Sequence, residues 1–191
     1  MFMRFPIPEF NRDEFKDMEW QAPTFLSADE TGDLIERQKS GDASAYGCYH
    51  VMPDDALFDK FAIRGEHRHA VMCVLPDTQV HVVGRSVAWA IQHIWIVDSL
   101  DAGSCQTIAD WKTPRPLNTR IGPEDGITVD GGVVYSLHAN AYGDHWMGNR
   151  TILDNDWDGD DDDHRGFRVL SAYDEDIDDF HDCNLQFQWA G

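Results

Sequence analysis

Short apolar segments with a period of two run through the chain from residue 67 almost to its end. They are separated by turns rich in Gly, Pro and Asp, and they cover residues 69–75, 79–83, 86–97, 127–129, 133–141, 150–153, 167–173 and 184–189. In an extended chain alternate side chains share one face, so this period indicates β-strands with a buried face. We therefore predict a mainly β fold, a β-sandwich or jelly-roll-like single domain.

Two hairpins are predicted from the turn residues between neighbouring segments. One covers residues 69–83 and turns at Pro76, and the other covers 127–141 and turns at Gly131. Both turns contain the residue types that favour a tight reversal of the chain. In the last segment, 184–189, apolar residues alternate with two glutamines, which predicts one buried face and one solvated face.

Two short helices are predicted before the strands. Ser27 and Glu30 have the spacing of a capping box, and Gly41 is a suitable stop, so we expect a helix over 28–39. A second helix is expected to start after Pro53 and to reach about residue 62. These helices belong to the domain predicted over residues 27–191.

Residues 1–26 form a candidate N-terminal arm, because three prolines interrupt them and aromatic residues recur along them. Such a segment is expected to dock on a protein surface, which is either its own domain or a neighbouring subunit. The candidate partner-binding residues in the arm are Phe2, Phe5, Phe10 and Trp20.

The charge of the chain excludes several partners. Its 191 residues include 35 acidic and 15 basic ones, for a formal net charge of −20. A surface this acidic repels phosphate backbones, which argues against binding to DNA or RNA. No apolar run reaches the ~18 residues of a membrane span, and the N-terminus lacks the features of a signal peptide. We expect synthesis in the cytoplasm without a membrane partner.

More than half of the net charge, −11, falls in residues 151–191. The first acidic run there resembles the opening half of an EF-hand calcium loop, with alternate carboxylates and Gly159 for the bend. Its twelfth position is Arg165 instead of Glu, so the prediction is a calcium site between strands. The alternative is a solvated acidic loop. The candidate Ca²⁺ ligands are Asp154, Asp156, Asp158, Asp160 and Asp162.

A second acidic run over residues 174–182 is a candidate surface for a basic protein partner, which it would attract electrostatically. The alternative is a charged loop that discourages pairing at a sheet edge. The candidate contact residues in this run are Asp176, Asp178, Asp179 and Phe180.

His67 and His69, followed much later by His138, resemble the H-x-H opening of a cupin metal site. The resemblance implies a metal-dependent enzyme on a β-barrel. The Glu that should follow the histidine pair is absent, and only Cys73 stands nearby as a substitute ligand. The alternative is that these are ordinary surface or core histidines.

The sequence favours a function other than catalysis, because it has no G-x-S-x-G motif and no Gly-rich phosphate loop. The leading hypothesis is a non-enzymatic structural or assembly protein, such as a phage or virus particle component, whose partners are other protein subunits. One alternative is an acidic inhibitor or immunity-type protein that neutralises a basic partner. The other alternative is the cupin-like enzyme.

Overall fold

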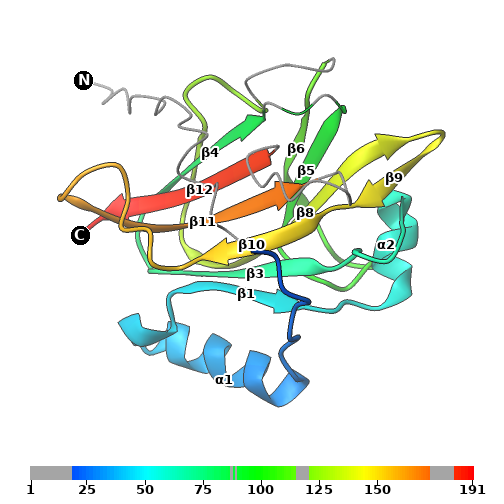
Figure 1. The fold of residues 1–191 in the computed structure, drawn as a ribbon. Coiled ribbons are helices and arrows are strands. Elements are labelled where there is room, and N and C mark those ends of the chain that lie inside the picture. Colours follow the sequence, from blue (N-terminus) through cyan, green and yellow to red (C-terminus); the bar gives the residue numbers. More distant parts are fainter. Residues whose placement is uncertain (1–18, 87, 89, 115–120, 173–182) are drawn as a thin grey trace.

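Two β-sheets pack face to face, and helices cover the outer side of one of them (Figure 1). The computed structural model describes residues 19–86, 88, 90–114, 121–172 and 183–191. Strands dominate these residues, so the predicted mainly β, sandwich-like fold class is confirmed. Of the predicted arm over 1–26, only residues 19–26 lie in the described part, where they follow an irregular path.

The first sheet is antiparallel along its main path. Its strands follow in the order β1 (Gly47–Val51), β3 (Ala70–Leu75), β8 (Gly132–Tyr142), β5 (Gln92–Val97) and β6 (Thr107–Lys112). At its edge, β9 (His145–Gly148) pairs with β8 and also, in parallel, with the two-residue β2 (Ile63–Arg64).

The second sheet is antiparallel throughout. Its strands follow in the order β10 (Arg150–Asp154), β11 (His164–Ala172), β12 (Cys183–Ala190), β4 (Val80–Ser86) and β7 (Ile127–Val129).

Both predicted hairpins are wrong, because each of these turns carries the chain from one sheet to the other. The strand before Pro76 pairs in the first sheet, whereas β4 pairs with β12 and β7 in the second. Likewise, β7 and β8 lie in different sheets. The two turns pack together: Gly131 has φ +81°, and a Cβ there would lie 2.0 Å from the Pro76 carbonyl oxygen. The turn residues predict a reversal, but not which strand receives the hydrogen bonds.

The main core lies between the sheets. Its centre includes the stacked rings of Phe167 and Phe187, whose centroids are 5.0 Å apart. Both side chains are inaccessible to solvent, as the alternation in their strands predicts.

A second core lies on the outer face of the first sheet, under α1 (Ala28–Lys39) and α2 (Asp55–Phe61). Because this sheet is covered on both faces, every residue of β3 and β5 is buried. Strand β5 starts only at Gln92, so the single strand predicted over 86–97 is wrong.

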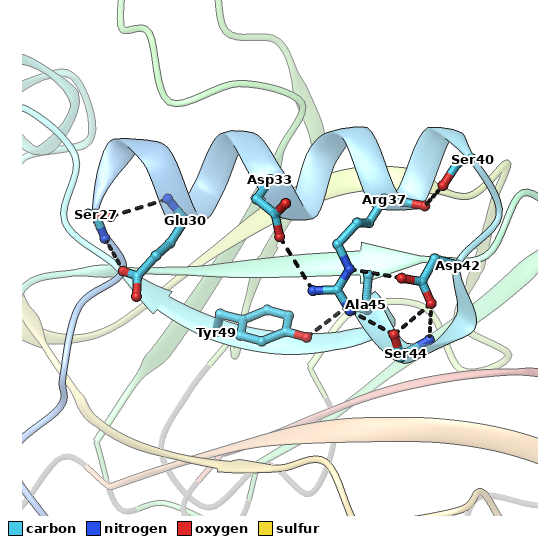
Figure 2. A network of polar contacts seen from close by, with 9 residues as sticks. All are labelled: Ser27, Glu30, Asp33, Arg37, Ser40, Asp42, Ser44, Ala45 and Tyr49. Carbon is cyan, nitrogen blue, oxygen red and sulfur yellow. Dashed lines mark hydrogen bonds and ion pairs between the residues drawn. The ribbon is translucent and has the colours of Figure 1, made fainter.

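Local polar contacts fix α1 and the turn that follows it (Figure 2). The predicted capping box is present, with Ser27 and Glu30 exchanging hydrogen bonds. Near the other end, the guanidinium of Arg37 donates to Asp42 at 2.9 Å and to Ser44 at 2.7 Å. Hydrogen bonds from Ser44, and then from Arg37, lower the pKa of Asp42 to about 2. These contacts hold the short η2 turn (Ala43–Ala45), which leads into β1.

The outer face of β12 in the second sheet is buried too, which contradicts the solvated face predicted for this strand. Gln186 and Gln188 are almost fully buried. The amide of Gln188 donates to Asp160 at 3.1 Å, so part of the acidic loop lies over this strand. On the same sheet, Trp20 packs against Leu170 and Ala172.

Candidate binding pockets

The acidic loop does not gather its carboxylates around one centre. Asp154 accepts a hydrogen bond from Arg168 at 2.7 Å, and these residues face each other across β10 and β11. Asp160 pairs with Gln188. Asp161 bonds the ring of His164 at 2.5 Å. Asp154, Asp160 and Asp161 thus have partners within the fold instead of a shared metal centre.

Within the residues that the structure describes, no three His, Cys, Asp or Glu side chains are placed to hold a metal ion. Three of the predicted ligands, Asp156, Asp158 and Asp162, are exposed to solvent. The proposed calcium site therefore has no support from the geometry of the described loop residues.

Asn155 anchors the start of this loop to β1. Its amide oxygen accepts from the backbone N–H of Cys48 at 2.8 Å, and its amide nitrogen donates to the Cys48 carbonyl at 3.0 Å. Gly47 is required beside it, because a Cβ there would lie 2.9 Å from the Asn155 amide oxygen and the backbone has φ +153°. This pair of bonds holds the loop over the edge of the sandwich.

The anchored loop forms one wall of a pocket of about 340 Å³, which we call the loop pocket. Tyr46 and Trp189 line it with rings 6.2 Å apart and nearly perpendicular, at 84°. Asp158 and Arg165, which are both exposed, add a carboxylate and a guanidinium to the lining. The loop pocket thus combines fixed aromatic surface with polar groups that have open access to a ligand.

A second pocket, of about 280 Å³, lies where residues 20–25 cross the sandwich; we call it the N-terminal pocket. Its apolar part includes Phe25 and Met52, which are among the exposed large hydrophobic residues. Its polar part includes Glu66, His67, Arg68, His69 and Arg150.

Beneath the N-terminal pocket, two histidines share the hydroxyl of Thr151. His50 Nε2 lies 2.8 Å and His69 Nε2 lies 2.7 Å from Thr151 Oγ1. His69 Nδ1 donates to the carbonyl of His67 at 2.7 Å, so in the neutral ring Nε2 is an acceptor. Thr151 then donates to His69 and accepts from His50. This arrangement joins β1 and the start of β3 in one sheet to β10 in the other.

His138 is buried nearby and pairs with Ser136 through Nε2 at 2.9 Å. Burial lowers the pKa of His50 and His69 to about 4 and that of His138 to about 3. Of the predicted cupin-like ligands, His67 and His69 line the N-terminal pocket, whereas His138 does not. The three do not form a metal-binding group among the described residues.

These low pKa values predict a loss of stability in mild acid. In the unfolded chain the three histidines take up protons near pH 6.5, but in the folded protein they stay neutral until about pH 4. Protons therefore favour the unfolded state, and the free energy of unfolding falls as the pH drops from 6.5 to 4. The expected slope is up to about 1.4 kcal/mol per pH unit for each fully buried histidine.

Urea titrations at pH 7, 6, 5 and 4.5 measure this slope. His138→Gln should flatten it, because one of the three groups is removed. The matched control is His145→Gln, at a surface turn beside the exposed Asp144. Equal flattening in the two variants would show that the buried cluster is not the origin of the slope.

Most of the other candidate residues lie outside the described part of the chain: Phe2, Phe5, Phe10, Asp176, Asp178, Asp179 and Phe180. Trp20, the described aromatic residue of the arm set, packs on its own domain and lines the N-terminal pocket. Sequence reasoning missed Tyr46, Trp189 and Arg165 as site residues. The one signal for them was the acidic loop, which is next to Arg165 in the sequence but close to Tyr46 and Trp189 only after folding.

No protein-family model matches the chain, and no curated protein matches it. Two lectins are among the solved structures that resemble its fold. One is the lectin CV2L of Chromobacterium violaceum in complex with alpha-methyl-fucoside, at 15% identity over 63% of this chain and 96% of that one, with a TM-score of 0.46. The other is the C-terminal domain of the BC2L-C lectin from Burkholderia cenocepacia, at 16% identity over 66% and 99%, also with a TM-score of 0.46.

The comparison corrects the functions predicted from the sequence. Both matched structures are lectins, and neither is a particle component, an inhibitor of a basic partner or a cupin enzyme. The predicted structural role in a phage or virus particle and its two alternatives have no support in these comparisons. Calcium binding finds no support either. Neither of the described helices is long and apolar enough to cross a membrane.

Proposed function

We propose that the protein is a carbohydrate-binding protein and that a saccharide binds in the loop pocket. The observation that carries this proposal is the pairing of two nearly perpendicular aromatic rings, Tyr46 and Trp189, with the side chains of Asp158 and Arg165 in one pocket. A sugar ring has an apolar C–H surface and a rim of hydroxyls, and this pocket offers a partner for each.

The polar groups suit vicinal hydroxyls. A carboxylate only accepts hydrogen bonds and a guanidinium only donates them, while a hydroxyl does both. Asp158 and Arg165 can therefore bind neighbouring hydroxyls of one sugar, and both can do so with two atoms at once. The rings supply rigid contact area at low conformational cost.

The size of the pocket limits the ligand. Its volume of about 340 Å³ is near the lower end of small-molecule sites, which run from ~300 to ~1,000 Å³. A mono- or disaccharide unit fits this range better than a long glycan bound along its length. Asn155 holds the loop in place before the ligand arrives, which reduces the entropy lost on binding.

Calorimetry with a panel of methyl glycosides, alpha-methyl-fucoside among them, tests the proposal. At least one sugar should bind. Asp158→Asn should weaken the affinity for that sugar about tenfold, because a charged hydrogen-bond acceptor is lost. Arg165→Gln should have an effect of similar size. Trp189→Phe should retain most of the affinity, since one ring replaces another.

Asp156→Asn is the matched control, because Asp156 is exposed in the same loop but does not line the pocket. It changes the net charge as Asp158→Asn does and should leave affinity unchanged. If no sugar in the panel binds, or if the two Asp variants weaken binding equally, the loop pocket is not a saccharide site.

A further inference from the structure

The N-terminal pocket collects positive side chains on a strongly acidic protein. Its positive charge comes from Arg68 and Arg150, whereas His69, which also lines it, is neutral at pH 7 because burial lowers its pKa to about 4. Among the described residues of the lining, Glu66 is the only acidic one, and it is exposed to solvent. In a chain with 35 acidic and 15 basic residues, a lining with two arginines and one acidic residue is the reverse of the overall balance. It favours an anionic ligand over a cation.

Aromatic rings hold both guanidinium groups. The guanidinium carbon of Arg68 lies 5.1 Å from the centroid of the Phe58 ring, and that of Arg150 lies 4.9 Å from the centroid of the Trp20 ring. Arg68 also donates to the exposed Asp55 at 2.9 Å. Stacking on a ring leaves the edge of the planar guanidinium able to form paired hydrogen bonds with a carboxylate.

The remaining lining suits an apolar body next to the charged group. Phe25 and Met52 are 36% and 50% exposed, which is high for large apolar side chains. Pro23 and Trp20 continue this surface. A ligand that covered it would remove apolar area from water, at about 25 cal/mol for each Å².

We propose that the N-terminal pocket binds a small organic monocarboxylate with an aromatic or branched apolar body. The carboxylate is held by Arg68 and Arg150, and the apolar body packs on Phe25 and Met52. The site is separate from the loop pocket and shares none of its lining residues. Its volume of about 280 Å³ limits the ligand to a small molecule.

Titration calorimetry of the whole protein at pH 7 tests the site with three probes: benzoate, benzyl alcohol and acetate. Benzoate should bind in saturable fashion. Benzyl alcohol lacks the charge and acetate lacks the ring, so each should bind at least about tenfold more weakly. Arg68→Gln and Arg150→Gln should each weaken benzoate binding about tenfold.

Arg64→Gln is the matched control, since Arg64 is exposed, pairs with Asp59 and does not line the pocket. It removes the same charge and should not change benzoate affinity. Circular dichroism shows which variants are folded. Because two arginines line the site, one folded arginine variant is enough to test the proposal. The proposal is overturned if benzoate does not saturate, if benzyl alcohol binds as tightly, or if Arg64→Gln has the same effect as the folded pocket variants. Sugar binding at the loop pocket is measured separately and does not depend on these results.

Discussion

Arg168→Met is expected to lower the free energy of unfolding by about 3 kcal/mol. Arg168 is 6% exposed, and its guanidinium bonds Asp154, whose side chain is 15% exposed, at 2.7 Å. Removing only the cation leaves a largely buried carboxylate without its partner. The cost of that uncompensated charge is larger than the net value of the ion pair itself. Urea unfolding at pH 7 gives the difference.

The double variant Arg168→Met, Asp154→Leu separates charge from packing. Replacing both partners by apolar residues of similar volume is often close to neutral, so the double variant should regain most of the lost stability. A double variant no more stable than Arg168→Met would mean that the loss arises from packing, including the contact of Arg168 with the Trp157 ring.

Thr151→Val is expected to cost about 2 to 4 kcal/mol, because it removes one hydroxyl that serves two imidazoles. Valine has nearly the same shape, so the core remains filled. His50 and His69 then each lose the hydrogen bond to Thr151 in a site where Thr151 itself is 2% exposed. A buried polar group without a partner costs about 1 to 3 kcal/mol.

Thr151→Ser is the matched control for this effect. It keeps the hydroxyl and loses one methyl group, at a cost of about 1 kcal/mol. Unfolding by urea at pH 7 should therefore rank the proteins as wild type, Thr151→Ser and Thr151→Val. Equal losses in the two variants would count against the shared hydrogen bonds and in favour of simple packing at this position.

The local signals in the sequence were reliable where the structure depends on neighbouring residues. The capping box at Ser27 and the expected helix over 28–39 are both confirmed. Seven of the eight expected segments coincide with strands in the structure, whereas β5 starts later than its expected segment. The reason is that caps and alternation act over a few residues, so the relevant partners are visible in the sequence.

The pairing of strands could not be predicted in this way. The turns at Pro76 and Gly131 look like hairpin turns, but both connect the two sheets. The choice depends on which partner strands are available, and those strands are distant in the sequence. Gln186 and Gln188 likewise follow the alternating pattern of a half-solvated strand but are buried, because other parts of the chain cover the sheet.

The sequence by itself determined the fold class, the two helices and the concentration of acid near residues 151–191. Only the tertiary structure decided what surrounds these acidic residues. Arg168 donates a hydrogen bond to Asp154, and Gln188 donates one to Asp160. Asp158 lines the loop pocket together with Tyr46 and Trp189. The physical reason is that charge and periodicity are properties of local sequence. A binding pocket, in contrast, is made by side chains that come together only when distant strands pair.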